Sequence, residues 1–395
     1  MVDFSIPPEL EALRQQVSAV VRDKIIPMEK DPRQGRHGPS EELRLELVEM
    51  TRAAGLLSPH APRQWGGLGL NHFEMAVIFE AASYSSLGAV AFNIQAPDEG
   101  NTNLLNQVAT EEQKEQWLRP LVSGKLRTVF AMTEPNNGAG SDPSLMKTEA
   151  RPQGDNYVIN GLKWLITGFD GGDVVIVMAR TFDAAGEDLG ATMFFVPAGT
   201  PGMREVRRQS SMDRNSPGGH SVVEFENVVV PASSILGQLG KGFRNAQVRL
   251  SPARLTHCMR WLGQAQRCHD IAVDYANQRM AFGKQIVRHQ GIGFQLADNE
   301  IELNLCRLAV WHCAWLLDQG DLARKQVSQC KVFCSEALGR VVDRSLQTLG
   351  GMGITDETIV EQTYSDIRAF RLYDGPSEVH RYVLARDLAA PVEQA

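Results

Sequence analysis

The chain has 395 residues, of which 43% are hydrophobic and 22% are charged. This composition is ordinary for globular proteins and excludes a mainly disordered or fibrous chain, while the length predicts two or three domains at about 150 residues each. Forty basic residues against 47 acidic ones give a net charge of −7. Nucleic acid is therefore not expected as a main partner, because no basic excess is available to neutralise its phosphates.

The N-terminal segment, the longest apolar stretch and the cysteines give expectations about location. The first residues lack the basic and apolar regions of a secretory signal and are not Arg-rich, so we expect a cytoplasmic protein. The stretch from Leu305 to Leu317 contains Arg307 and His312 and falls short of the ~18 apolar residues of a membrane span, so we expect a buried helix. Six cysteines in the last third lack zinc-site spacing, which predicts reduced thiols in a core and no metal site.

The spacing of apolar residues changes twice along the chain. It is helical up to about residue 126, where Thr110-Glu-Glu-Gln113 has the pattern of a capping box. Short β-branched and aromatic runs follow to about residue 236, and helical spacing then returns, most clearly at Val327, Cys330, Cys334, Ala337 and Val341. The sequence predicts an α+β, mainly α protein with an N-terminal helical domain (1–126), a middle, mostly antiparallel β domain (127–236) and a C-terminal helical domain (237–395).

Two local features of the middle region give sharper expectations. Asn160-Gly161 separates the runs Tyr157–Ile159 and Leu162–Thr167, and this dipeptide is a strong signal for a hairpin turn. The run Arg204–Arg214 is locally basic, which predicts a solvated loop.

Several common enzyme motifs do not occur in the sequence. Gly138-Ala-Gly140 and Gly351-Met-Gly353 are not completed by a third glycine at dinucleotide-fold spacing, and there is no P-loop, nucleophile elbow or zinc-binding H-E-x-x-H helix. No two histidines have metal-ligand spacing. Rossmann, P-loop, α/β-hydrolase and zincin folds therefore have no support.

What remains is a set of five stretches, most of them rich in Gly, Ser or Thr, at changes of secondary structure. Small residues let backbone amides approach a ligand, an Arg between helices suits a pyrophosphate, and a carboxylate beside Gly-Pro can be a positioned base. Each stretch also has an ordinary alternative: a loop, a strand, a helix-capping glycine cluster or, for Asp374, a helix N-cap. The stretches are Phe130–Asp142, Lys163–Gly168, Arg279–Lys284 with His289-Gln290, Gln347–Gly353 and Leu372–Arg381.

Taken together and in this order, the five stretches resemble the acyl-CoA dehydrogenase family. They contain T-E-P…G-S-D, K-x-x-I-T, R-x-x-F-G, Q-x-x-G-G-x-G and Y-[ED]-G, and the resemblance covers nearly the whole chain. Phe92–Asn101, Gly218–His220 and Asp374–His380 resemble the branch that in animals is fused to a phosphotransferase-like domain, and that domain is not expected within these 395 residues. The resemblance implies a helical N-terminal domain, a middle β domain and a C-terminal four-helix bundle, with FAD at a subunit interface.

The resemblance also implies which residues bind the cofactor. Those expected at the isoalloxazine ring are Met132, Thr133, Ile166 and Thr167, and Ser141 is expected near the diphosphate and the substrate. Those expected to reach FAD bound mainly by the neighbouring subunit are Arg279, Phe282, Gln290, Gln347, Gly350 and Gly351, with Ser377 and Glu378 at the adenine part. Two departures from the family pattern are the extra Asn136-Asn137 and Leu165, which stands where an aromatic residue usually stacks.

The family's base is a carboxylate followed by Gly, and Asp374 with Gly375 holds that place. The family's alternative position, just before an Arg, holds Ala253 ahead of Arg254, so Asp374 is the well-placed candidate. In the implied reaction the base takes the Cα proton of an acyl-CoA thioester and a hydride leaves Cβ for flavin N5, giving a trans-2-enoyl-CoA. The resemblance implies that a flavin ribityl hydroxyl and the backbone amide two residues after the base stabilise the enolate. That residue is here Pro376, which has no N–H, so the amide of Asp374, or less favourably that of Gly375, is expected to serve instead. Arg254 is expected either to order base and substrate or to form a structural ion pair.

The region expected to line the acyl tunnel is polar. The residues expected in the tunnel are Asn93, Gln95, Asp98 and Asn101. Further substrate contacts are expected from Ser141, Arg254 and Tyr373. Buried polar groups need partners, so a substrate with a hydroxyl or other polar group is predicted.

The resemblance implies FAD as cofactor, an electron-transfer flavoprotein as acceptor, and a homodimer or homotetramer. A flavin oxidase of the same fold is one alternative, since sequence does not distinguish the electron acceptors. A catalytically weak, DNA-binding flavoprotein is another, and the net negative charge argues against it.

Overall fold

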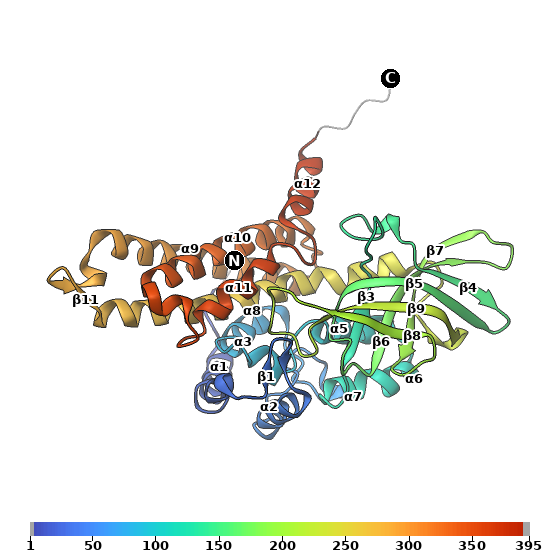
Figure 1. Cartoon of the computed structure of the whole chain (residues 1–395), viewed down its shortest axis with the longest axis horizontal. Helices are drawn as coiled ribbons and strands as arrows, with labels where there is room; N and C mark the ends of the chain where they lie inside the picture. Colours follow the sequence, from blue (N-terminus) through green and yellow to red (C-terminus); the bar gives the residue numbers. More distant parts are fainter. Residues whose placement is uncertain (1–3, 390–395) are drawn as a thin grey trace. The chain divides into compact units, whose positions relative to one another are not determined.

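The computed structural model describes residues 4–389, which form two compact units (Figure 1). The helical unit contains the residues up to Glu29, Leu70–Ala89 and those from Ala253 onward, and the sheet unit contains Lys30–Gly69 and Val90–Pro252. Helices precede and follow the strands along the chain, as the sequence predicts. The boundaries of three consecutive domains stay a prediction. No helix within residues 4–389 is long and apolar enough to cross a membrane.

The helical unit is built from long helices whose apolar stripes are buried. The five residues of the predicted stripe from Val327 to Val341 are all buried on one face of α10, which confirms the helical period. The elements are α1 (Pro8–Val20), α3 (His72–Ala82), α9 (Gln290–Asp318), α10 (Arg324–Leu349), α11 (Val360–Phe370), α12 (Ser377–Leu388), β11 (Met280–Ala281) and β12 (Lys284–Gln285). Two helices have residues in both units, α4 (Gly88–Ala91) and α8 (Gly242–Gln278).

The stretch Leu305–Leu317 is helical but only partly buried. Cys306, Val310 and Cys313 on α9 are fully buried, whereas 47% of Leu305 and 37% of Leu308 are exposed in the single chain. The expectation of a buried helix is therefore wrong for one face. The reason is geometric: α9 packs on α3 and α10 with one stripe, and side chains on another side of the helix stay partly in solvent.

All six cysteines are buried, and none of the six forms a disulfide. The sulfur atoms of Cys258, Cys330 and Cys334 lie within 4.8 Å of one another. Sequence spacing did not predict this cluster, because Cys258 comes from α8 and the other two from α10.

The sheet unit holds one large, mostly antiparallel sheet with the strand order β10-β7-β6-β4-β5-β9-β8. Its parallel pairings are β3 with β6 and β4 with β6. The strands are β3 (Thr128–Ala131), β4 (Glu149–Gln153), β5 (Asn156–Thr167), β6 (Val174–Phe182), β7 (Asp188–Pro197), β8 (Met203–Gln209), β9 (His220–Pro231) and β10 (Ile235–Leu236). The other elements are β1 (Gln34–Gly35), β2 (Gly38–Pro39), α2 (Glu41–Ala53), α5 (Asp98–Val108), α6 (Glu111–Gln113) and α7 (Arg119–Val122). The predicted capping box of Thr110 and Gln113 begins α6.

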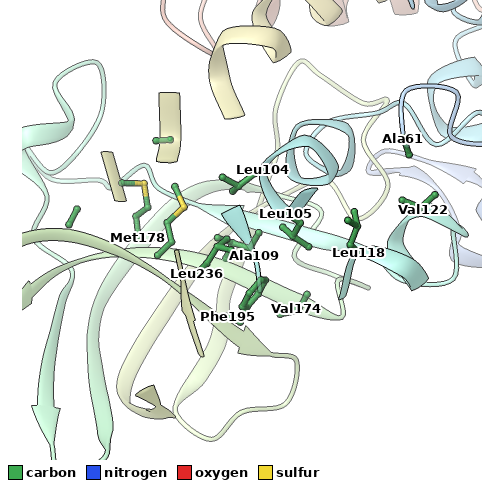
Figure 2. Close-up of a cluster of buried hydrophobic side chains, with 14 of the residues drawn as sticks. Ala61, Leu104, Leu105, Ala109, Leu118, Val122, Val174, Met178, Phe195 and Leu236 are labelled. Carbon is green, nitrogen blue, oxygen red and sulfur yellow. The ribbon is translucent and has the colours of Figure 1, made fainter. Parts of the chain in front are cut away.

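Strand β6 is apolar on both faces because both are covered. Val174, Ile176 and Met178 join one hydrophobic cluster, while Val175 and Val177 join another, as the two-residue period of a strand requires. Figure 2 shows the first cluster, in which Leu104, Leu105 and Leu118 lie beside strand residues such as Phe195. The helices before β3 thus cover this face of the sheet.

The predicted hairpin at Asn160-Gly161 is wrong. The chain turns earlier, at Gly154-Asp155 between β4 and β5, and Asn160-Gly161 lies inside β5 at a break in its register with β9. The glycine is required for close packing, because a Cβ there would lie 2.4 Å from Thr148 Oγ1 and 2.7 Å from its Cα. The Asn160 side chain accepts a hydrogen bond from the Asn227 amide at 2.7 Å.

The basic run was predicted to be a loop, and this is wrong for its first part. Residues 204–209 belong to β8, which lies at the edge of the sheet and pairs only with β9 along the strand order. Charged, exposed side chains are common on edge strands because they discourage pairing with other chains. The charges therefore reflect an edge strand with most of its side chains in water.

The Gly161→Ala substitution tests the role of close approach in β5. We expect it to destabilise the protein by about 1 to 3 kcal/mol, because the Thr148 backbone must move to admit the methyl group. Gly339→Ala on α10 is the matched control, since a Cβ there meets nothing within 4 Å and alanine favours helix. Thermal unfolding measures both, and an unchanged midpoint for Gly161→Ala would contradict the packing argument.

Candidate active site

The loop after β3 and the end of β5, both expected to meet the cofactor, are joined by a buried ion pair. Lys163 Nζ lies 2.8 Å from Glu134 Oε1 and donates to the Met132 carbonyl oxygen at 3.0 Å. Further donors to the carboxylate are the backbone amides of Ala139, Lys147 and Thr148. Burial alone would raise the pKa of Glu134, but Lys163 and the other donors outweigh it and lower this pKa to about 2. The loop is therefore anchored by an ionised carboxylate at neutral pH.

Beyond this pair, hydroxyl, backbone and exposed apolar groups lie together. Thr133 Oγ1 donates to the Trp164 carbonyl oxygen at 2.6 Å, and the Trp164 amide donates to the Thr133 carbonyl oxygen at 3.1 Å. Leu165 has a left-handed φ of 54°, and its amide donates to Gln209 Oε1. Trp164 and Leu165 keep 37% and 47% of their surface exposed, while Ile166 is buried and Met132 half-buried. These groups fit a large planar ring that has apolar faces and polar edges.

His220, which sequence reasoning did not assign to the site, contacts the Thr167 side chain. Thr167 Oγ1 lies 3.0 Å from His220 Nδ1, and His220 Nε2 lies 3.3 Å from Asp213 Oδ2. In the neutral ring, the proton on Nε2 is donated to the Asp213 carboxylate and Nδ1 accepts from the Thr167 hydroxyl. The Thr167 hydroxyl proton then points toward His220, and the oxygen lone pairs remain available to accept hydrogen bonds. The Gly-Gly-His motif was the available signal, but the partner of His220 lies 53 residues earlier.

The Asn136-Asn137 insertion forms an exposed turn. Both residues have left-handed φ values, 57° and 59°, which asparagine tolerates better than most residues. Lys147 Nζ donates to the Asn136 carbonyl oxygen at 2.6 Å and ties the turn to the chain that leads into β4. Ser141, expected near the diphosphate, is exposed just after this turn.

The residues expected to line the acyl tunnel are buried, but most already have partners in the sheet unit. Asn93 donates to Ser58 Oγ at 2.8 Å and to the Leu121 carbonyl oxygen at 2.9 Å. Asp98 accepts from the amide and hydroxyl of Thr128, and burial raises the pKa of Asp98. Asn101 donates to Thr128 Oγ1 and accepts from Arg249 Nε, each within 2.9 Å.

Gln95 differs from these three. Its Nε2 donates to Asp98 Oδ2 at 3.4 Å, and its Oε1 is a buried acceptor without a partner among the described residues. The sequence argument that polar side chains here need a polar substrate therefore depends on Gln95 alone.

In the helical unit, the backbone of Asp374 is held in an unusual conformation. Its φ is 51°, and its carbonyl oxygen accepts from Arg254 Nε at 3.0 Å and from His380 Nε2 at 3.3 Å. Its carboxylate Oδ2 lies 3.1 Å from His257 Nε2. The N-cap position of α12 belongs to Pro376, so the alternative that Asp374 is a simple N-cap is wrong.

The other residues expected at the base lie around it. Arg254 is largely buried, which lowers its pKa although the nearby Asp374 opposes this, and its Nε contacts the Asp374 backbone. The Tyr373 hydroxyl accepts from Trp261 Nε1 at 2.5 Å. Gly375 has a φ of 96°, and a Cβ there would lie 2.9 Å from His380 Nε2. Only glycine fits here without moving that histidine.

Sequence reasoning missed three groups that hold this loop. Lys331 on α10 donates to the carbonyl oxygens of Phe370 at 2.7 Å and Gly375 at 3.3 Å. His380 and His257 contact the backbone and carboxylate of Asp374. His380 was visible in the motif D-G-P-S-E-V-H, whereas Lys331 and His257 lie on other helices and carry no local signal.

The residues expected to reach a neighbouring subunit's FAD are mostly exposed. Phe282 is 96% exposed with a left-handed φ of 46°, and its ring packs edge-on against His289. Figure 1 shows β11, which Phe282 directly follows, at one end of the helical unit and α12 elsewhere in it. Ser377 on α12 is buried, and the exposed residues are Arg279, Gln290, Gln347, Gly350, Gly351 and Glu378. Within one copy these residues therefore form separate groups.

His380 gives the helical unit a testable pH dependence. Burial first, and then the nearby cations Arg254 and Lys331, lower its pKa to about 4. In the unfolded chain His380 binds a proton near pH 6.5, whereas in the folded chain it binds one only near pH 4. The free energy of unfolding should therefore decrease as the pH falls from 6.5 to 4, by about 3 kcal/mol at most.

His380→Asn should remove this component of the pH dependence, whatever it does to overall stability. The exposed His312→Asn is the matched control and should keep the parental slope. Thermal midpoints from pH 7 to pH 4 measure the difference, and parallel curves for His380→Asn and the parent would contradict the assignment.

Comparisons with known proteins identify the family of this fold. Family models of acyl-CoA dehydrogenases match in order: the N-terminal domain at residues 7–125, the middle domain at 129–228 and the C-terminal domain at 240–389. FadE2 of Mycobacterium tuberculosis is 38% identical over 80% of this chain and 79% of its own. Acyl-CoA dehydrogenase family member 11 of Rattus norvegicus is 36% identical over 86% of this chain, which spans only 44% of that relative.

A solved structure agrees with these sequence relatives. Butyryl-CoA dehydrogenase of Megasphaera elsdenii superposes with a TM-score of 0.86 at 30% identity, covering 98% of this chain and 100% of that one. The predicted fold class is thereby confirmed. The chain belongs to the acyl-CoA dehydrogenase family and is an FAD-dependent oxidoreductase.

Proposed function

We propose that the chain catalyses α,β-dehydrogenation of an acyl-CoA thioester to a trans-2-enoyl-CoA, with Asp374 as the base. The observation that carries this proposal is the fixed carboxylate of Asp374, on a left-handed backbone whose carbonyl oxygen accepts from Arg254 and His380. The alternative family position for a base, just before Arg254, is occupied by Ala253. When bound, FAD supplies the acceptor for the hydride that leaves Cβ.

The chain's own residues handle the proton and the developing negative charge. The Cα proton passes to the Asp374 carboxylate, and bound substrate would exclude water and strengthen that base. The enolate oxygen needs preorganised donors, each contributing roughly 3 kcal/mol in a dry site. Pro376 has no N–H, so the backbone amide of Asp374, or that of Gly375, is the donor that we propose.

The assembly and electron acceptor belong to the same proposal. The nearly fully exposed Phe282 and the exposed leucines of α9 support a homodimer or homotetramer in which a second copy covers them. An electron-transfer flavoprotein is the proposed acceptor, and oxygen consumption in its absence would favour the oxidase alternative. A cytoplasmic location stays a prediction.

Asp374→Asn tests the base directly. Asparagine has nearly the same shape and tolerates a left-handed φ, so FAD binding should be retained while anaerobic bleaching of the flavin by an acyl-CoA panel slows by about 10²- to 10⁴-fold. Asp343→Asn on the exposed side of α10 is the control and should bleach at the parental rate. Parental bleaching by Asp374→Asn would overturn the proposal.

A substrate with a hydroxyl on the acyl chain is a finer proposal, supported by the buried and unpartnered Oε1 of Gln95. A hydroxyacyl-CoA should then be used more efficiently than an unsubstituted acyl-CoA of equal length. Gln95→Leu should reduce this preference about tenfold, since one hydrogen bond contributes about 1 kcal/mol or slightly more. Steady-state kcat/KM for matched substrates measures it, and preference for the unsubstituted chain by the parent protein contradicts the idea.

A further inference from the structure

His257 lies directly against the proposed base but was not assigned a role by any sequence motif. It stands on α8, its side chain is 9% exposed, and its Nε2 is 3.1 Å from Asp374 Oδ2. Its ring centroid lies 4.6 Å from that of Tyr373. The imidazole is therefore enclosed and in hydrogen-bond contact with the carboxylate.

The other ring nitrogen determines which tautomer is present. His257 Nδ1 lies 2.8 Å from a terminal nitrogen of Arg260, one turn along α8. A guanidinium only donates hydrogen bonds, so Nδ1 must accept, and the ring proton of a neutral imidazole must be on Nε2. His257 thus donates to Asp374, and the contact of Arg260 with Nδ1 opposes a second ring proton.

We propose that His257 is a positioning residue that keeps the Asp374 carboxylate ionised and oriented for proton abstraction, and that it does not take the substrate proton itself. This inference rests on the proposed function. A donor at Oδ2 favours the charged form of a carboxylate and fixes its plane. When bound substrate excludes water, the pKa of the Asp374 carboxyl rises. Without a donor at Oδ2, the carboxyl would then be protonated at mildly acidic pH and could not accept the substrate proton.

Other charged groups near Asp374 bond to the backbone of its loop, and the charges of Arg254 and Lys331 also interact with the Asp374 carboxylate. Arg254 on α8 and His380 on α12 donate to the backbone carbonyl oxygen of Asp374, and Lys331 on α10 donates to that of Gly375. The pKa of His380 is about 4, so it stays neutral above pH 5. The thiol of Cys258 is a further titratable group and lies beside Lys331.

The decisive experiment compares two substitutions of His257 across pH. His257→Phe keeps a flat ring but cannot donate, whereas the amide of His257→Gln can still donate near the position of Nε2. We measure kcat and KM for an acyl-CoA from pH 5.5 to 9, with FAD absorbance and thermal midpoint as checks on folding. His257→Phe should move the acidic limb of kcat up by about one pH unit and leave KM unchanged, while His257→Gln should restore most of the parental profile.

Three outcomes would overturn the inference. They are a parental acidic limb in His257→Phe, an equal loss at every pH in both variants, and a change confined to KM. If His257→Phe does not fold, ¹⁵N chemical shifts of the parent's histidines, assigned by loss of a signal in His257→Gln, still decide. A doubly protonated or Nδ1-protonated ring at pH 7 contradicts the proposal, and an Nε2-protonated neutral ring supports it.

The same assays separate this inference from the proposed function. If Asp374→Asn is inactive and His257→Phe keeps the parental pH profile, only the role of His257 is wrong. If Asp374→Asn bleaches at the parental rate, the assignment of the base fails and the role of His257 fails with it.

Discussion

Two buried cations determine the path of the chain around Asp374. Lys331 is 1% exposed and Arg254 is largely buried, and a buried cation without partners costs several kcal/mol. Their hydrogen bonds go to carbonyl oxygens at and after the end of α11, those of Phe370 and Gly375 for Lys331 and that of Asp374 for Arg254. Presenting these oxygens within six residues requires φ values of 51° at Asp374 and 96° at Gly375. The place of the proposed base is thus a consequence of how two buried charges are satisfied.

In the sheet unit the buried charge is negative, and hydrogen bonds from other parts of the chain compensate it as well. There a carboxylate, Glu134, is buried, and its partners are one ammonium group and three backbone amides. The amides belong to the loop after β3 and to the residues that lead into β4, while Lys163 belongs to β5. The ionised Glu134 carboxylate therefore holds these three segments together. This leaves Thr133 and Trp164 with their backbones paired and the Trp164 surface exposed. Rigid placement of such groups is what the expected cofactor contacts of this loop would need.

Local patterns in the sequence predicted local structure well and long-range contacts poorly. The helical period at Val327–Val341 and the capping box at Thr110 depend on neighbours in the chain, and both were right. Asn160-Gly161 carries a hairpin signal, yet Gly161 is there because Thr148, which directly precedes β4, approaches it. His257 was invisible for the same reason, since its partner is 117 positions away. The ordered set of motifs succeeded where single motifs were ambiguous, because it tests distant parts of the chain together.

The aspartate, where the family usually has glutamate, can be explained by this environment. Aspartate tolerates a left-handed φ better than glutamate, because its short polar side chain can bond locally. The short side chain also keeps the carboxylate within 3.1 Å of His257, whose own position on α8 is set by Arg260. A glutamate would carry its carboxylate one methylene further from the same backbone. The left-handed backbone and the shorter acid together therefore place the carboxylate within hydrogen-bond distance of the histidine.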